Sequence, residues 1–360
     1  MSIKPKLFSP GPVDVAPETY EAMCGPTIGH RGKDFEELYA SVQPGLQEVA
    51  GSSRPVFINT ASAWGAMEGS IRNLTRKKVL NLCCGAFSDK WYDVSLRCGK
   101  EADKVQVEWG QPITPELVRE KLSEGGYDTV TLVHNETATG VLNPLADIVK
   151  AIREFDDIMI VVDTVSSFSA VPLSFDDLGI DVLLCGVQKA IALPPGISLM
   201  IVSEAALERA KEQADRGYYF DFHEFEKNHV KNNTPSTPAI PHIYGLKERV
   251  GFMLAEGLEN RFARHAATNA LTHEWVAKHG FENLAPEGYE SKSLTCVENN
   301  LEIDVPGFVK AVREKHNFLI NGGYGKIKGL TFRISNMGNE TVETQKELLD
   351  ALDDVIPDFL

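Results

Sequence analysis

One lysine of this 360-residue sequence is surrounded by apolar residues, which is unusual for a cation. Lys189 lies in CGVQKAIALPPG (185–196), between an apolar run and a rigid Pro-Pro-Gly turn. Burial disfavours the charged form of a lysine, and a neutral amine attacks a carbonyl carbon to form a Schiff base. The alternative is a lysine whose stem is covered while its amine reaches the surface. Gln188 and the turn fix Lys189 on both sides, which favours the chemical role.

Three further residues follow apolar runs of the same kind. Asp163 closes IMIVVD (158–163), and a carboxylate there is either buried with a cationic partner or functional. Ser62 follows PVFIN (55–59) and precedes a helix pattern, whose N-terminus can hold a phosphate; the alternative for Ser62 is a simple N-cap. Phe87, in CCGAFSDKW, suits stacking on a flat ring, although a core position is its default interpretation.

Together these residues meet the needs of pyridoxal 5'-phosphate. That cofactor requires a lysine for its aldehyde, an acid for its pyridine nitrogen and a cup for its phosphate. Lys189, Asp163 and Ser62 answer these needs in that order. The acid keeps the ring nitrogen protonated, so that the ring accepts electrons from a carbanion. The sequence therefore predicts a pyridoxal phosphate enzyme with Lys189 and Asp163 as its catalytic residues.

These side chains require a sheet that brings them to one edge. Short apolar, β-branched runs alternate with amphipathic segments such as TPELVREKLSEG and LADIVKAIREF. This alternation indicates an α/β fold with a mostly parallel sheet covered by helices on both faces, where ligands bind at the carboxyl ends of the strands. The predicted strands are 55–59, 78–83, 128–134, 158–163, 181–185 and 197–202.

The pattern changes after about residue 255. A long helical stretch, short strand candidates and a last helix predict a smaller α+β domain over 256–360. The Pro-rich residues 1–20 are unsuited to regular structure and are predicted to form an N-terminal arm. Residues 21–255 then form the large domain that binds the cofactor, in keeping with a length that suits two domains.

Composition restricts the possible partners and the compartment. The formal net charge of −15 argues against nucleic acid and anionic membrane as partners, and no apolar run is long enough to span a bilayer. The six cysteines are scattered without a C-x-x-C pair, so we expect neither a metal site nor a disulfide framework. A reducing cytoplasm fits this pattern best.

With these motifs in place, the sequence resembles the class V aminotransferases of pyridoxal phosphate fold type I. Within them it is similar to the branch of alanine–glyoxylate, serine–pyruvate and phosphoserine aminotransferases. The resemblance implies a mostly parallel seven-stranded sheet with helices on both faces and a smaller C-terminal α+β domain. It covers nearly the whole chain and rests on the segments FSPGPVDVAPE, NTASAWGAMEG, HNETATGVLNPL, VVDTVSSFSAVPL, GVQKAIALPPG, TPAIPHIYGL and FRISNMG.

The resemblance implies a role for each matching residue. Lys189 matches the Schiff-base lysine and Asp163 the partner of the pyridine nitrogen. Arg333 matches the arginine that clamps the substrate α-carboxylate, for which its planar fork is suited. Thr237 matches a residue that reaches the phosphate of the neighbouring subunit, which implies a homodimer with shared active sites. The other cofactor-binding residues implied in this way are Ser62, Ala63, Trp64, Phe87, Thr137, Val165 and Gln188.

The implied reaction is transamination in two half-reactions, with small amino-acid and 2-oxo-acid substrates. Alanine or serine is the expected donor, and glyoxylate or pyruvate the expected acceptor. Gly11, His30 and Arg31 are expected at the substrate. A His-Arg pair at this place also resembles the phosphate site of the phosphoserine branch. Phosphoserine or aspartate with 2-oxoglutarate is therefore the alternative, and an exposed pair before a helix is the simplest interpretation.

The sequence departs from the family pattern at two positions, and it disfavours two other functions. Trp64 replaces a small residue of the phosphate turn, and Val187 stands where a hydroxyl residue is common. A cysteine desulfurase is disfavoured because the stretch before Arg333 contains no cysteine. A non-catalytic subunit of a larger complex is disfavoured because the chemical residues are all present.

Overall fold

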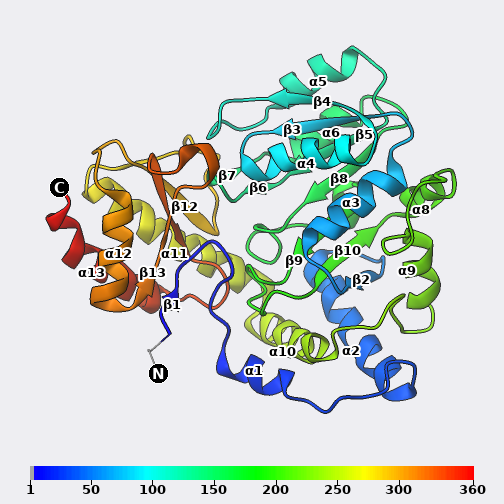
Figure 1. The fold of residues 1–360 in the computed structure, drawn as a ribbon, viewed down its shortest axis with the longest axis horizontal. Coiled ribbons are helices and arrows are strands. Elements are labelled where there is room, and N and C mark those ends of the chain that lie inside the picture. Colours follow the sequence, from blue (N-terminus) through cyan, green and yellow to red (C-terminus); the bar gives the residue numbers. More distant parts are fainter. Residues whose placement is uncertain (1–3) are drawn as a thin grey trace.

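The main sheet gathers the predicted strands into one layer (Figure 1). The computed structural model describes residues 4–360, and within them this sheet has seven strands in the order β2-β10-β9-β8-β5-β3-β4. All of its strands are parallel except β10, which runs antiparallel to both of its neighbours. The strands are β2 (Val56–Asn59), β3 (Lys78–Cys83), β4 (Glu101–Gln106), β5 (Thr129–Val133), β8 (Met159–Asp163), β9 (Val182–Gly186) and β10 (Ser198–Val202).

The predicted mostly parallel α/β sheet is confirmed, and strand β4 was missed. Its sequence EADKVQ is charged because β4 is an edge strand that pairs only with β3. The outer side of an edge strand is unpaired, and the residues of β4 are exposed or only partly buried, so it lacks the apolar run by which buried strands are found.

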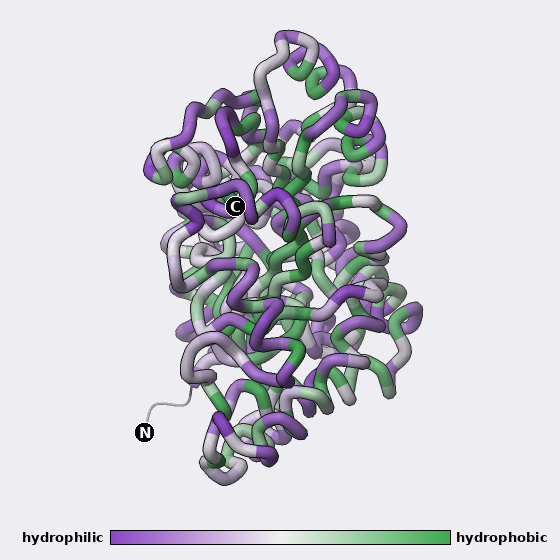
Figure 2. The backbone as a smooth tube through the Cα atoms, turned by 90° about the vertical axis from the view of Figure 1, so that its right-hand side faces the viewer, coloured by the Kyte–Doolittle hydropathy of each residue, from purple (hydrophilic) through white to green (hydrophobic). Residues whose placement is uncertain are grey.

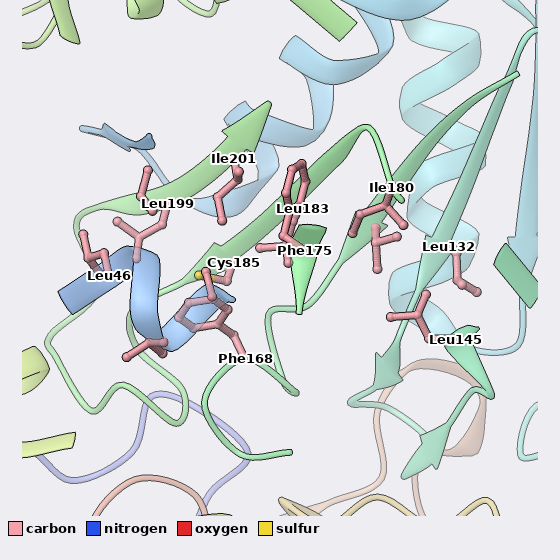
Figure 3. Close-up of a cluster of buried hydrophobic side chains, with 14 of the residues drawn as sticks. Leu46, Leu132, Leu145, Phe168, Phe175, Ile180, Leu183, Cys185, Leu199 and Ile201 are labelled. Carbon is pink, nitrogen blue, oxygen red and sulfur yellow. The ribbon is translucent and has the colours of Figure 1, made fainter. Parts of the chain in front are cut away.

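Each central strand sends alternate side chains into two separate cores. Val161 of β8 belongs to one core, whereas Ile160 and Val162 belong to the other. Figure 3 shows part of the larger core, where Leu132, Leu183 and other strand residues meet side chains of the covering segments. Because successive strand residues point to opposite faces, a strand covered on both sides is mostly apolar along its length.

Helices cover both faces of the sheet. Residues of α2, α5, α6, α7 and α10 pack in the core that contains Ile160, and residues of α3, α4, α8 and α9 pack in the core that contains Val161. The helices of this part are α1 (Pro17–Met23), α2 (Lys33–Ala50), α3 (Ala63–Leu74), α4 (Ala86–Arg97), α5 (Pro115–Ser123), α6 (Leu145–Ile152), α7 (Phe175–Leu178), α8 (Glu204–Lys211), α9 (Phe222–His229) and α10 (Ile240–Glu256).

The C-terminal part has its own sheet and its own core. Its four-stranded sheet has the order β11-β12-β15-β14, and Trp275, Phe308 and Phe332 are among the residues of its core. Its elements are α11 (Leu258–Lys278), β11 (Glu282–Asn283), β12 (Leu294–Glu298), α12 (Val305–His316), β13 (Phe318–Leu319), β14 (Asn321–Gly322), the 3₁₀ turn η1 (Gly325–Ile327), β15 (Thr331–Ser335), α13 (Val342–Val355) and the 3₁₀ turn η2 (Ile356–Asp358).

The N-terminal segment is more regular than its prolines suggested. Strand β1 (Lys6–Leu7) pairs in parallel with β13 of the C-terminal part, and Phe8 is buried in that core. Helix α1 begins at Pro17, a first helical position that proline tolerates well. The expectation that residues 1–20 lack regular structure is therefore wrong. From β1 beside the C-terminal part, the segment runs to α1, which packs against α10 (Figure 1).

Hydropathy follows this layered arrangement. The tube in Figure 2 alternates between hydrophobic and hydrophilic residues along the outer helices, as expected for helices with one buried face. Across residues 4–360, no helix combines the length and the apolar character that a membrane span requires.

Candidate active site

A cavity of about 400 Å³ lies where the carboxyl ends of the central strands meet the N-terminal segment. Its volume is in the range of small-molecule sites. Most of the residues predicted to bind the cofactor or substrate line it: Gly11, Ser62, Ala63, Trp64, Phe87, Thr137, Asp163, Val165, Gln188 and Lys189. The other lining residues are Pro12, Met67, Val133, Asn135 and Pro195.

A wider groove of about 730 Å³ elsewhere on the surface contains none of the predicted residues. His134 lines it, and burial lowers the pKa of that histidine to about 4, so its ring is neutral at physiological pH. None of the described residues that line this groove is a lysine or an arginine. Schiff-base formation requires an amine, so the smaller cavity, which contains Lys189, is the candidate active site.

Lys189 follows β9 and extends into the cavity with 7% of its surface exposed. Its Nζ donates a hydrogen bond to the carbonyl of Pro10, in the N-terminal segment. Burial lowers the pKa of Lys189 to about 7; nearby Arg333 lowers it further, while Asp163 and Glu136 oppose the shift. A large fraction of the amine is therefore neutral near pH 7, the form that acts as a nucleophile.

Asp163 is the last residue of β8, and its carboxylate receives two hydrogen bonds. The backbone N–H of Val165 donates to Oδ1 at 2.9 Å, and the indole N–H of Trp91 donates to Oδ2 at 3.3 Å. Burial raises the pKa of Asp163 to about 6, and the two N–H donors counteract that shift. A positively charged donor in the cavity would be the third partner of this carboxylate.

The start of helix α3 forms another wall of the cavity. Ser62 is the N-cap of α3, but its side chain makes no capping hydrogen bond, so its hydroxyl is free for another acceptor or donor. The first N–H groups of a helix lack partners and attract anions. Trp64, which is 50% exposed, stands at the cavity with Lys90 Nζ 5.5 Å from the centre of its ring.

Phe87 lines the cavity from helix α4 and is only half-buried, so it is not the simple core residue that was its default interpretation. Glu136 fixes the start of this helix, because its carboxylate accepts the backbone N–H groups of Phe87 at 3.3 Å and Ser88 at 2.9 Å. Tyr324 stacks on Phe87 with ring centroids 5.4 Å apart and planes inclined by 14°.

Hydroxyl and amide groups line the cavity beyond β5. Thr137 Oγ1 lies 2.5 Å from Ser166 Oγ. Asn135 donates through Nδ2 to the carbonyl of Ser166, while its Oδ1 is buried without a partner among the described residues. Gln188 packs its amide over Gly186, whose missing side chain leaves the space. These groups are available to a polar ligand.

Arg333 does not line the cavity itself but lies behind Thr137. It is 7% exposed, and it donates to the carbonyl of Thr137 at 3.3 Å and to the carbonyl of Gly322 at 3.2 and 3.3 Å. Its guanidinium is 5.7 Å from the ring centre of Tyr324. No carboxylate pairs with it in the described chain, so its charge is available for an anion.

Besides Arg333, three predicted residues are not brought to the cavity within this chain. Arg31 is exposed and donates to Asn233 Oδ1 and the carbonyl of Thr234, both at 3.1 Å. His30 is half-buried beside it, and Thr237 is exposed. Val187, the departure from the family pattern, is fully buried in the large core.

The cavity fits pyridoxal phosphate on grounds independent of family resemblance. It combines a lysine that loses its proton readily, a buried carboxylate with one side toward the cavity, and a helix start whose serine hydroxyl is free. Asn135 Oδ1 also lacks a partner there. These are the groups that an aldehyde, a pyridine nitrogen and a phosphate require.

Several residues of the site were missed. Trp91 and Glu136 were overlooked because a buried aromatic residue and a helix-capping carboxylate have no short motif. Asn135 had a signal, since it is a polar residue directly after an apolar strand in HNETATG. Pro10 acts only through its backbone carbonyl, which sequence composition does not reveal.

Comparisons with known proteins agree with this site. The family described as "Aminotransferase class-V" matches residues 32–315. An uncharacterized aminotransferase of Methanocaldococcus jannaschii is 35% identical over 98% of this chain and 91% of its own length. A serine–glyoxylate aminotransferase of Methylorubrum extorquens is 32% identical over 92% and 86%. The solved structure of alanine–glyoxylate aminotransferase from a Nostoc species has a TM-score of 0.94 at 27% identity, covering 99% of this chain and 96% of that one.

The chain therefore belongs to the class V aminotransferase family. It has the fold of type I pyridoxal phosphate enzymes and is a pyridoxal phosphate-dependent transaminase.

Proposed function

We propose that this enzyme moves an amino group from a small L-amino acid, alanine or serine, to glyoxylate or pyruvate. The observation that carries the proposal is the meeting of Lys189, Asp163 and Ser62 in one cavity, with the unpaired guanidinium of Arg333 behind it. Similar proteins named for serine–glyoxylate and alanine–glyoxylate transfer support this choice of substrates. Phosphoserine or aspartate with 2-oxoglutarate is the weaker alternative.

The proposed cofactor contacts follow from where the side chains lie. Lys189 is the Schiff-base lysine, Asp163 faces the pyridine nitrogen, and Ser62 with the first turn of α3 holds the phosphate. When bound, the cofactor withdraws electrons from the substrate and so acidifies its α-carbon. Phe87 and Val165 enclose the ring from two sides. The remaining contacts in this proposal come from Ala63, Trp64, Thr137 and Gln188.

Lys189 has a second task as the base and acid of the reaction. Its Nζ takes the proton from the substrate α-carbon and returns a proton in the reverse half-reaction. A pKa near the working pH suits a group that has to do both. The pKa of about 7 that burial gives Lys189 meets this condition.

Arg333 binds the α-carboxylate that every amino-acid and oxo-acid substrate shares. Its guanidinium is held in orientation by the carbonyls of Thr137 and Gly322, which leaves donors for a carboxylate. Tyr324, whose ring centre is 5.7 Å from the guanidinium, stacks on Phe87, and we expect these two rings to limit the space for a substrate side chain. This restriction favours small substrates.

A homodimer belongs to the same proposal. Thr237 and Arg31 are exposed in the single chain, as expected for residues that serve the site of a second copy. In the dimer, His30 and Arg31 would then lie near a substrate.

We also assign the enzyme to the cytoplasm, which the free cysteines support, since five of the six are buried thiols. The separate cores support a division into an arm (1–20), a large domain (21–255) and a small domain (256–360).

Absorbance spectra of the enzyme reconstituted with pyridoxal phosphate test the proposal. The visible band of the bound cofactor should be abolished in K189A and bleached in the wild type by alanine or serine. Bleaching only by phosphoserine, aspartate or glutamate would replace the proposed donors by the alternative. A band that K189A retains would remove Lys189 from its role.

A further inference from the structure

Trp91 is a buried core residue that reaches the candidate active site through its indole nitrogen. It lies in α4, is 1% exposed, and packs in the core that contains Val161. Its indole nitrogen nevertheless ends at the carboxylate of Asp163, to which it donates at 3.3 Å. An indole has one donor, and burial requires that donor to find an acceptor. Among the acceptors of this core, it is Asp163 that receives it.

The carboxylate of Asp163 is held from two directions. The backbone N–H of Val165 donates to Oδ1 at 2.9 Å, and Trp91 donates to Oδ2. The backbone of Asp163 is fixed as well, because its carbonyl accepts the N–H of His134 at 2.9 Å. The backbone N–H of Val165, two residues along the chain, fixes the orientation of Oδ1. The orientation of the second oxygen depends on Trp91, which is 72 positions away in the sequence.

We propose that Trp91 is a positioning residue of the transaminase, whose indole N–H keeps the Asp163 carboxylate ionised and aimed at the pyridine nitrogen of the cofactor. This inference rests on the role proposed above for Asp163. Trp91 touches neither cofactor nor substrate in it, since it does not line the cavity.

Hydrogen bonding and burial act on Asp163 in opposite directions. Burial favours the protonated acid and raises its pKa to about 6, while the Val165 and Trp91 donors favour the carboxylate. The ionisable groups that face Asp163 are Glu136, which raises its pKa, and Lys189, which lowers it; the charge of Asp163 in turn adds to the burial that raises the pKa of the Cys185 thiol. Loss of the Trp91 donor makes the carboxylate more basic. The proton between Asp163 and the ring nitrogen then moves toward Asp163.

The experiment follows the ring nitrogen directly. Enzyme reconstituted with pyridoxal phosphate labelled with ¹⁵N in the ring is measured by NMR for the wild type, W91F and D163N. We expect a protonated nitrogen in the wild type, an unprotonated one in D163N, and an intermediate shift in W91F. The turnover number of W91F should fall about tenfold with KM within about twofold, because one hydrogen bond to a charged group is lost.

Trp275 supplies a matched control. It is also a buried tryptophan whose indole N–H donates to a carboxylate, that of Asp353, at 2.7 Å, but it lies in the C-terminal part. W275F should keep the ¹⁵N shift and KM of the wild type. If W91F does not fold, replacement of Trp91 by 3-benzothienylalanine keeps the ring shape and removes only the N–H.

The outcomes separate this inference from the proposed function. A wild-type ¹⁵N shift in W91F, or in the benzothienyl variant, with D163N still unprotonated, overturns the role of Trp91 and leaves Asp163 in place. An unprotonated nitrogen in the wild type overturns both. An intermediate shift that W275F shares would show a general effect of losing a buried tryptophan and would also overturn the inference.

Discussion

Gly11 lies so close to Lys189 that a methyl group on its Cα would be 2.5 Å from Cδ and 3.0 Å from Nζ of the lysine. The carbonyl of the preceding residue, Pro10, accepts the hydrogen bond from that Nζ. The N-terminal segment therefore forms one wall of the space in which the lysine moves. This wall is anchored to the C-terminal part through strand β1.

G11A should displace Lys189 and strain the backbone, because Gly11 has a φ of +107° that other residues rarely adopt. A displacement of the reacting group by about 1 Å costs on the order of 100-fold in rate. Steady-state kinetics of the purified variant measure this loss. Gly251 in α10 has open space around it and is the control. G251A should keep full activity, and equal rates for the two variants would contradict the role of Gly11.

Lys189 should react as a nucleophile at a pH where ordinary lysines are protonated. Its pKa is lowered to about 7 by burial, so the amine is protonated and inert below pH 7 and neutral and reactive above it. Competitive acetylation of the apoenzyme with acetic anhydride, read by mass spectrometry of the Lys189 peptide, should give a midpoint near 7. In denatured protein the same lysine should show a midpoint of about 10.4. A folded-state midpoint above 9 would refute the prediction.

The variants S62A and S203A should affect different properties: the first cofactor affinity, the second the stability of the fold. Ser62 caps α3 without a side-chain hydrogen bond, so S62A should leave apoenzyme stability unchanged and weaken pyridoxal phosphate binding about tenfold. Ser203 accepts the N–H of Ala206 at 3.0 Å, so S203A should cost about 1 kcal/mol of stability and leave cofactor affinity unchanged. Thermal unfolding and fluorescence titration measure the two properties. A normal cofactor affinity in S62A would exclude the proposed phosphate contact.

R333K should raise KM for both substrates by about 10- to 100-fold, because lysine keeps the charge but cannot bind a carboxylate with two parallel hydrogen bonds. It would also lose the donors that now hold Thr137 and Gly322. Initial rates over a range of donor and acceptor concentrations provide the test. R313K, at an exposed site in α12, is the control and should behave as the wild type. An unchanged KM in R333K would place the carboxylate elsewhere.

Arg261 should be essential for the stability of the segments that carry the two proposed catalytic residues, Asp163 and Lys189. It is fully buried, and it donates to the carbonyl of Ser169 at 2.9 Å, to the carbonyl of Ala190 and to Glu256 at 3.1 Å. R261M would leave the buried carbonyls of Ser169 and Ala190 without this donor, which costs about 3 kcal/mol or more, while Glu256 would keep its hydrogen bonds from Arg264. Urea unfolding monitored by circular dichroism measures the change in the free energy of unfolding. R97M, at an exposed arginine of α4, should leave the transition unchanged.

The sequence alone determined the fold class and the centre of the site. Strands β3, β5, β8, β9 and β10 are mostly apolar because both faces of the sheet are covered, so they were predicted to within one or two residues. Asp163 closes β8, and Lys189 and Ser62 lie just after the ends of β9 and β2. Parallel strands bring their carboxyl ends to one edge, so local position in the sequence was sufficient to predict that these side chains meet.

Only the tertiary structure decided what holds those side chains in place. Trp91 reaches Asp163 across 72 positions, and Lys189 reaches Pro10 across 179. The edge strand β4 lacks an apolar pattern because solvent covers it, and Arg31 uses its guanidinium on backbone and amide groups of a distant loop. Such contacts depend on how elements pack and on single hydrogen bonds between them. Composition ignores the position of residues, and periodicity describes only residues that are near one another in the sequence. Neither therefore predicts a contact between distant residues.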